Sequence, residues 1–164
     1  MDNYLMLDGK KYELSPELAN ALRSCVEPEP EKKSPFLREK GQRYWRIGTK
    51  GAVYEDNDIS TNTDNLHYAV ANYCTDKALM EQRAMHETLN RLLWRYSEEH
   101  GGDGEWGCRY NYYICLSKTM VLEVHYLDNY LIQGAIYFKD RKTAEDAIEQ
   151  IVKPFLAAHP DFVW

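Results

Sequence analysis

A run of prolines and charged residues near the N-terminus restricts the fold of this chain more than any other feature. Residues 27–35 contain three prolines and five charged residues. Proline lacks the backbone N–H that helix interiors and central strands need, and a stretch of this composition forms an extended linker. We therefore predict three parts: an N-terminal appendage over residues 1–26, a linker over residues 27–42, and a main domain over residues 43–164.

The appendage is expected to be a β-hairpin followed by a short helix. Residues 4–7 are a short apolar run, and Asp8-Gly9 after it is a strong signal for a tight turn. Residues 11–14 can form the returning strand. A helix should then begin at Ser15-Pro16-Glu17, because serine caps helices and proline fits the first helical position.

The main domain is predicted to belong to the α+β class. Its strand candidates are dense in Tyr, Ile, Val, Trp and Leu, which suit a pleated and half-buried surface. We expect an antiparallel sheet of about five strands with two main helices packed on one face, in addition to the N-terminal hairpin-helix. The strand candidates are residues 43–48, 52–55, 110–117, 120–126 and 133–138.

The two main helices are predicted from their caps and their apolar stripes. Thr75 is expected to cap the first helix, and Gly101-Gly102 should end it. Asp140 should cap the second helix, and Pro154 should kink or restart it. The apolar tail at residues 161–164 is expected to dock on the domain. The apolar face of the first helix consists of Met85, Leu89, Leu92, Leu93 and Tyr96.

Two segments share one pattern and suggest an internal repeat. Residues 72–79 and 137–144 each place an aromatic residue two positions before a Thr or Asp that can cap a helix, and an apolar-faced helix follows. The aromatic ring would pack down where the chain turns from extended to helical. The alternative is that the pattern is only a common way to begin a helix.

Three short motifs carry a resemblance to other proteins. They are Tyr44-Trp45-Arg46-Ile47 followed by Gly51, Asn72-Tyr73-Cys74-Thr75 at the start of a helix, and Ile136-Tyr137-Phe138 with Ala144. Over roughly residues 43–152 the chain resembles a broad group of uncharacterised small proteins of bacteriophages and mobile elements of gut bacteria. Their pattern is a W-x-I strand, a glycine turn, an N-x-F-x-T-x-E-x-A helix start and a late x-Y-F strand. This chain departs from it at Tyr73 and Lys77, where Phe and Glu are usual. The resemblance implies a phage or mobile-element origin and carries over no functional residue.

The sequence contains no motif for catalysis or for a cofactor. His86-Glu87 begins the spacing of a zinc-protease helix, but position 90 is Asn where that motif has its second histidine. Residues 101–104 are rich in glycine but lack the Gly-Lys-Ser/Thr end of a phosphate-binding loop. We therefore expect no enzyme activity, no metal and no cofactor. The cysteines form no CxxC pair and are expected to be reduced packing residues: Cys25, Cys74, Cys108 and Cys115.

Charge and hydropathy narrow the partners of the chain. The formal net charge is −6 and the isoelectric point is about 5.4. Nucleic acids are bound mainly through Lys and Arg, so an acidic chain favours a protein partner. No run approaches the roughly 20 apolar residues that span a bilayer, and residues 1–10 lack the apolar core of a signal peptide. We expect a cytoplasmic protein that does not bind membranes.

Aromatic and basic residues gather on two of the predicted strands and are the candidate binding residues. If these strands share an open sheet face, the rings could stack on the bases of a single-stranded nucleic acid. The alternative is that one aromatic set belongs to the core. The candidates are Tyr44, Trp45 and Arg46 on one strand and Arg109, Tyr110 and Tyr112 on another.

These observations favour a binding or accessory protein over an enzyme. We predict a protein of phage or mobile-element origin that acts through a protein partner, with an anti-defence role as the more specific form of this hypothesis. A single-stranded nucleic-acid-binding protein that uses the aromatic and basic strands is the alternative. A free sheet edge or the apolar C-terminal tail could also support a homodimer.

Overall fold

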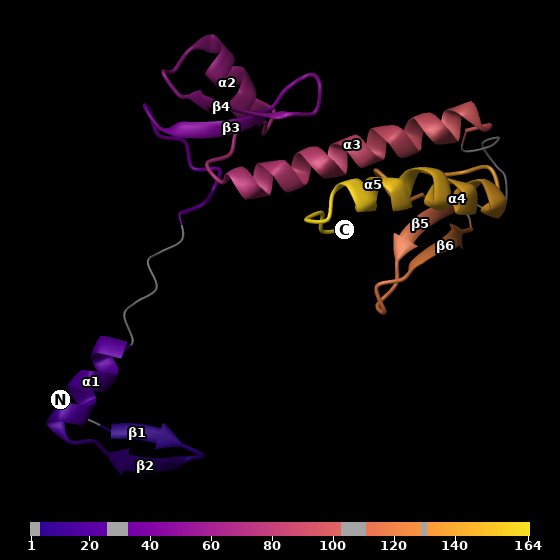
Figure 1. The fold of residues 1–164 in the computed structure, drawn as a ribbon. Coiled ribbons are helices and arrows are strands. Elements are labelled where there is room, and N and C mark those ends of the chain that lie inside the picture. Colours follow the sequence, from indigo (N-terminus) through magenta and orange to yellow (C-terminus); the bar gives the residue numbers. More distant parts are fainter. Residues whose placement is uncertain (1–3, 26–32, 103–110, 129–130) are drawn as a thin grey trace. The chain divides into compact units, whose positions relative to one another are not determined.

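The chain folds into two compact units. They comprise Met1–Ser34 (unit 1) and Pro35–Trp164 (unit 2) (Figure 1). The boundary falls inside the predicted linker, and residues 35–42 of that linker belong to unit 2. The computed structural model describes residues 4–25, 33–102, 111–128 and 131–164.

Unit 1 begins with a two-stranded hairpin. Strand β1 (Tyr4–Leu7) pairs antiparallel with strand β2 (Lys10–Glu13). Between the strands, Asp8 and Gly9 have φ angles of 50° and 76°. Two successive residues with positive φ are what the tight two-residue turn of a hairpin requires. The turn therefore lies where the sequence predicts it.

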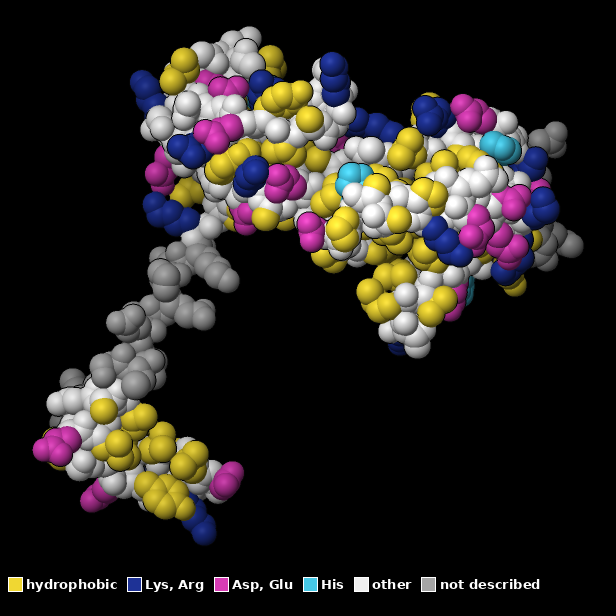
Figure 2. All heavy atoms as spheres, viewed as in Figure 1, with side chains coloured by type: hydrophobic (Ala, Val, Ile, Leu, Met, Phe, Trp, Pro, Cys, Tyr) yellow, Lys and Arg dark blue, Asp and Glu magenta, His cyan; other side chains and the backbone are white. Residues whose placement is uncertain are grey.

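Helix α1 (Pro16–Cys25) follows the hairpin. The backbone N–H of Leu18 donates a hydrogen bond of 3.2 Å to the Ser15 hydroxyl, so serine caps this helix as predicted. Ala19 is buried, whereas the larger apolar side chains are exposed and form a hydrophobic band over the hairpin and the helix (Figure 2). The exposed side chains are Tyr4, Leu5, Met6, Leu7, Tyr12, Leu18 and Leu22.

Unit 2 contains two further hairpins and a series of helices. The hairpins pair β3 with β4 and β5 with β6, both antiparallel. The strands are β3 (Arg43–Ile47), β4 (Val53–Asn57), β5 (Asn111–Leu116) and β6 (Leu122–Leu127). The helices are α2 (Asn62–Ala69), α3 (Lys77–Glu99), α4 (Arg141–Ala147), the π-helical η1 (Ile148–Val152) and α5 (Lys153–Ala158).

The first half of unit 2 joins its hairpin to a helix through a single β-bridge. The backbone N–H of Trp45 in β3 donates to the Cys74 carbonyl at 2.7 Å, and the Cys74 N–H donates back at 3.1 Å. Asp76 then caps α3 by accepting a hydrogen bond from the backbone N–H of Leu79. The prediction that Thr75 is this cap is wrong, because the Thr75 N–H and hydroxyl both donate to the carbonyl of Pro35.

The second half is built in the same way. Tyr112 in β5 bridges Phe138, and Asp140 caps α4 as predicted. In both halves the bridging residue lies two positions before the aspartate cap. A buried tyrosine comes directly before each bridging residue, namely Tyr73 and Tyr137. The two halves therefore share a hairpin, a tyrosine, a bridge and a capped helix, with the tyrosine three positions before the cap.

The prediction of one antiparallel sheet of about five strands is wrong. In the described parts of the chain the strands form three separate two-stranded sheets, β1–β2, β3–β4 and β5–β6. The hairpins of unit 2 lie along different parts of α3 and its neighbouring helices (Figure 1). The predicted strand at residues 133–138 is reduced to one bridge at Phe138, because the chain enters the α4 cap two residues later. Two helices on one face of a common sheet are therefore also excluded.

Helix α3 connects the two hydrophobic clusters of unit 2. The smaller cluster lies at the β3–β4 hairpin and includes Ile47 and Cys74, whereas the larger one includes Phe138. The predicted apolar face of this helix packs into the larger cluster, with Met85 and Leu92 only partly buried. The buried residues that α3 contributes are Met80 and Ala84 to the smaller cluster and Leu89, Leu93 and Tyr96 to the larger one.

The C-terminal helix changes type before its proline. It is π-helical over Ile148–Val152 and α-helical again from Lys153, next to Pro154. Proline lacks the N–H of the regular ladder, so a helix changes or restarts around it, as the sequence predicts. None of the helices in the described parts of the chain combines the length and the apolar character needed to cross a membrane.

Candidate functional site

The candidates on the first aromatic strand are part of the fold of unit 2. Tyr44 is fully buried, and its ring stacks on Tyr73 with 4.2 Å between the ring centroids. Trp45 packs against the smaller hydrophobic cluster. The Nε atom of Arg46 lies 3.3 Å from a carboxylate oxygen of Asp56. Tyr44 therefore has no free face on which a base could stack.

The candidates on the second strand do not join the first set. Tyr112 is half-buried and packs against the larger cluster, in a hairpin that is separate from β3–β4. Arg109 and Tyr110 lie outside the residues that the structure describes. On α3, Arg83 and Arg91 each approach a carboxylate oxygen of Glu87 at 3.0 Å. Among the described residues, the two aromatic strands therefore lie in separate sheets and share no sheet face.

A buried carboxylate, Asp58, ties the segment after β4 to the beginning of unit 2. The Arg38 guanidinium contacts both of its oxygens, with Nη2 donating to Oδ1 at 3.0 Å and Nε contacting Oδ2. The Ser60 N–H donates a further hydrogen bond of 2.8 Å to Oδ1. The Arg38 side chain lowers the pKa of Asp58 to about 2. Asp58 is therefore ionised at neutral pH, and its oxygens are used by the fold.

A second buried carboxylate, Asp64, joins β3 to α2. One oxygen accepts a hydrogen bond of 2.9 Å from the Tyr44 hydroxyl, and the other accepts the N–H and the hydroxyl of Thr61, both at 2.8 Å. Burial raises the pKa of Asp64, but the hydrogen bonds from Thr61 and Tyr44 hold it below its ordinary value. The Tyr44 hydroxyl also lies 3.0 Å from Nδ1 of His67, whose pKa is lowered by burial.

This polar network is structural. Throughout the described residues, no buried side-chain nitrogen or oxygen lacks a hydrogen-bond partner. A ligand that entered the network would have to break hydrogen bonds that already exist, at a cost of about 1–3 kcal/mol for each group left unpaired. The network holds α2 and the loop before it against the β3–β4 hairpin, and among the described residues it leaves no unpaired buried group there for a ligand.

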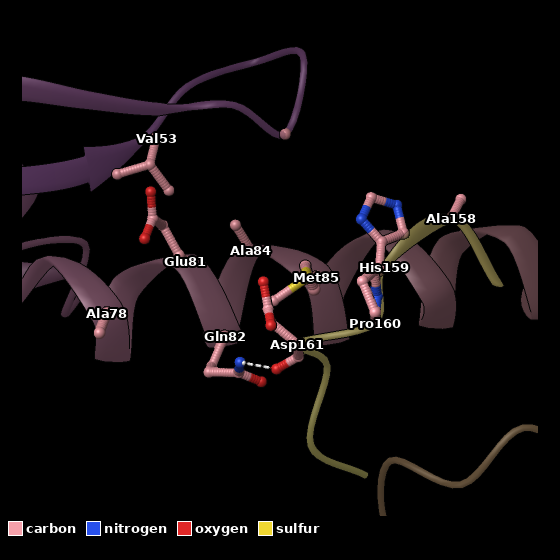
Figure 3. A pocket seen from close by; sticks show the side chains of 11 residues that line it. Val53, Ala78, Glu81, Gln82, Ala84, Met85, Ala158, His159, Pro160 and Asp161 are labelled. Carbon is pink, nitrogen blue, oxygen red and sulfur yellow. Dashed lines mark hydrogen bonds between the residues drawn. The ribbon is translucent and has the colours of Figure 1, made fainter. Parts of the chain in front are cut away.

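A groove over the N-terminal part of α3 is the candidate functional site (Figure 3). It lies between the β3–β4 turn and the segment that follows α5, and its volume is about 540 Å³. A smaller cavity of about 100 Å³ shares part of its lining. The groove is lined by Gly51, Val53, Ala78, Glu81, Gln82, Ala84, Met85, Ala158, His159, Pro160 and Asp161.

The C-terminal wall of the groove is fixed by one glutamine. The side-chain amide of Gln82 donates a hydrogen bond of 2.6 Å to the Asp161 carbonyl and accepts one of 3.0 Å from the Val163 N–H. The Phe162 ring packs against Phe155 with 5.5 Å between the centroids. The His159 ring packs against Phe155 as well, at 4.4 Å. The tail therefore docks on unit 2, as the sequence predicts.

The opposite wall is the turn between β3 and β4. Gly51 has a φ of +79°, and a Cβ atom at this position would lie 3.0 Å from the Thr88 hydroxyl of α3. Thr88 is held there by donating to the Ala84 carbonyl at 2.8 Å. Glycine therefore provides both the left-handed backbone and the close approach of this wall to the helix.

The groove has acidic edges and an apolar floor. Glu81 and Asp161 carry carboxylates, and no Lys or Arg is among the residues that line it. The Glu81 carboxylate and the His159 ring project to the side of α3 that faces the β3–β4 hairpin (Figure 3). Lys77 lies 3.2 Å from Glu81, but exposed pairs of this kind are weak and exchange readily. The groove therefore suits a cationic group with an apolar stem.

The described residues form no metal-binding cluster, and the pKa values of the two described thiols are raised. No group of three His, Cys, Asp or Glu side chains is placed to hold a metal ion. Burial raises the pKa of the Cys74 and Cys115 thiols, which makes them poor nucleophiles at neutral pH. Cys108 and the side chain of Cys25 lie outside what the structure describes. The groove lining includes no Ser, Thr, Cys or Lys that could attack a substrate.

The groove residues were not among the candidates that the sequence suggested. Gln82 on α3 and Asp161 in the tail are 79 positions apart in the chain, so no local motif links them. One sequence signal for the groove was the apolar tail, because the tail forms the C-terminal wall where it docks. A second was Gly51 in the predicted turn, because glycine permits close approach.

Comparison with known proteins does not assign the chain to a family. No family model, curated protein or solved structure matches it. The resemblance to phage and mobile-element proteins therefore stays a prediction.

Proposed function

We propose that this chain is a non-enzymatic binding protein whose groove over α3 takes a basic segment of a partner protein. The observation that supports this most is the combination of two carboxylates, Glu81 and Asp161, with an apolar floor and no Lys or Arg in the lining. Such a lining is complementary to lysine or arginine side chains. The proposal places binding outside the buried hydrogen-bond network of Asp58 and Asp64.

The fit follows from how long basic side chains are buried. Lysine and arginine lay their aliphatic stems along apolar surface and keep the charged head at a polar edge. Val53 and Met85 supply such a surface, and Glu81 and Asp161 supply the edge. A volume of about 540 Å³ is in the range of roughly 300–1,000 Å³ that small ligands occupy. The groove therefore suits a short stretch of a partner and not a whole domain.

The charge of the molecule also favours a basic protein over a nucleic acid. The net charge of −6 attracts a basic surface at long range and repels phosphates. Three arginines that could have formed a basic stripe already contact carboxylates: Arg46 with Asp56, and Arg83 and Arg91 with Glu87. If the chain comes from a phage or mobile element, a host protein with an exposed basic segment, such as a nuclease, is the partner that this charge would fit.

A peptide-display selection tests the proposal without knowledge of the partner. The full chain is used to select from a random peptide library, and the best peptides are titrated by fluorescence anisotropy. We expect enriched peptides with Lys or Arg next to an apolar residue. Replacing both carboxylates (E81Q/D161N) should weaken their binding by about two- to thirtyfold, since each lost exposed ion pair contributes roughly 0.2–1 kcal/mol.

A double variant with the same charge change provides the control. Glu145 and Asp146 lie on α4, outside the lining of the groove, and form exposed pairs with Arg141 and Lys142. E145Q/D146N should bind the selected peptides as the wild type does. Enrichment of acidic peptides, or equal losses in both double variants, would remove the proposal.

A further inference from the structure

The hairpin of unit 1 has two exposed edge strands. Among the described residues β1 and β2 pair only with each other, and all four residues of each strand are exposed. An isolated two-stranded hairpin is at best marginally stable in water, and a unit of this size buries too little surface to compensate. The hairpin therefore has the properties of an element that is completed by further pairing.

The two edges of this hairpin differ in charge. Strand β1 reads Tyr-Leu-Met-Leu and has no charged residue, whereas β2 carries Lys10, Lys11 and Glu13. Charged side chains, and lysine above all, are the usual protection of an edge strand against pairing with another chain. The β2 edge is therefore protected, and the β1 edge is open to another strand.

The two faces of the hairpin differ as well. Leu5 pairs with Tyr12 and Leu7 with Lys10, so Leu5, Leu7 and Tyr12 point to one face. On the other face the Lys11 ammonium lies 4.2 Å from the centroid of the Tyr4 ring. The first face is mostly apolar, so further strands added to the hairpin would enlarge an apolar surface.

We propose that β1 pairs antiparallel with β1 of a second copy of the chain, which joins two hairpins into a four-stranded sheet around a two-fold axis. Pairing β1 with itself brings no like charges together because the strand carries no charge, whereas the lysines of β2 protect its edge against pairing. The two-fold axis can also join the apolar faces of both copies into one surface. The dimer rests on β1 alone and is independent of the groove on α3.

A second copy fits this edge better than an unrelated segment for two reasons. In a closed two-fold dimer the same uncharged strand supplies the backbone N–H donors and C=O acceptors on both sides of the interface. Most soluble oligomers have closed symmetry of this kind. Four strands with a shared apolar face also reach the size at which a sheet is stable by itself. The N-terminal unit is thus a dimerisation module that the charged segment at residues 27–35 separates in sequence from the groove-bearing unit.

Sedimentation equilibrium of the full chain tests the dimer. We expect a mass twice that of the 19.3 kDa chain, with reversible dissociation at low concentration. A matched pair of substitutions locates the interface: Met6 is 55 % exposed in β1, and Met120 is 73 % exposed in the turn after β5. M6K should raise the dissociation constant at least about tenfold, because symmetry places the new charge in the interface twice. M120K should leave it unchanged.

Cross-linking keeps the test decisive if M6K also disturbs the hairpin itself. In the proposed sheet the two β2 strands are three strand spacings apart, roughly 14 Å, which lysine cross-linkers can span. A mixture of isotope-labelled and unlabelled wild-type chains should give intermolecular links between Lys10 or Lys11 of one copy and the same lysines of the other. A monomer at all concentrations, a dimer without these links, or equal effects of M6K and M120K would overturn the proposal.

Discussion

Replacing Arg38 with alanine should destabilise unit 2 by about 2 kcal/mol at neutral pH. Arg38 is the main reason why the pKa of the buried Asp58 is about 2, against an ordinary value of 3.8. One pKa unit corresponds to about 1.4 kcal/mol, so the whole shift corresponds to about 2.5 kcal/mol. The Arg38 side chain is 22 % exposed, and the Ser60 hydrogen bond would remain, so we expect somewhat less than this full value.

The effect should depend on pH in one direction. The pKa of Asp58 is lower in the folded than in the unfolded state, so its stabilisation is present above its unfolded pKa and is lost as the pH falls toward about 2. The wild type and R38A should therefore differ most at neutral pH. Their free energies of unfolding should converge as the solution is acidified below about pH 4.

Urea unfolding followed by tryptophan fluorescence measures this difference. All four tryptophans follow residue 34, so the signal reports unit 2 alone. R46A is the control, because the ion pair of Arg46 with Asp56 joins two partly exposed side chains and should contribute less than about 1 kcal/mol. Equal losses in R38A and R46A, or a difference that grows on acidification, would refute the reasoning.

Two further predictions concern the fold of unit 2. F138A removes a fully buried ring from the larger cluster and should cost about 3–5 kcal/mol in thermal or urea unfolding, whereas W94A, at a side chain 59 % exposed, should cost less than about 1 kcal/mol. G51A should destabilise more than G41A. Both glycines have positive φ, but only at Gly51 would the new Cβ meet a neighbour, the Thr88 hydroxyl. Equal unfolding free energies for G51A and G41A would contradict the close approach of the groove wall to α3.

The parts of the fold that could be predicted depend on neighbouring residues. The Asp8-Gly9 turn and the Asp140 cap are decided by the conformations and hydrogen bonds of a few consecutive residues. The misplaced cap at Thr75 shows the limit of such reasoning. Threonine and aspartate are adjacent and both suit a cap, and only the contact of Thr75 with the distant Pro35 decides between them.

The arrangement of the strands could not be predicted, because it depends on which edges meet. Residues 133–138 have strand-like composition, yet they supply one bridge, at Phe138. Alternation along β3 correctly separates the side of Tyr44 from the side of Trp45, but it cannot say which side is covered. The covering group is α2, which reaches Tyr44 through Asp64. Tyr44 is fully buried, as expected under the alternative that one aromatic set belongs to the core.

The groove depends on contacts between residues that are even farther apart in the sequence. Its acidic edges, Glu81 and Asp161, stand on different elements, and the tail reaches its place through the amide of Gln82. A glutamine on an exposed helix face has no distinctive signal in a sequence. The tail prediction found the right segment, but only the tertiary structure shows that its docking creates a lined space.

The central claim is that a basic partner segment binds in the groove, and methyl NMR of the methionines tests it most directly. The chain has five methionines, of which Met85 lines the groove, Met80 is buried in α3, and Met6 and Met120 are exposed elsewhere. When a selected basic peptide is added, the Met85 methyl signal should shift and saturate, while those of Met6 and Met120 stay in place. A shift of Met6 or Met120 without one at Met85 would contradict the account.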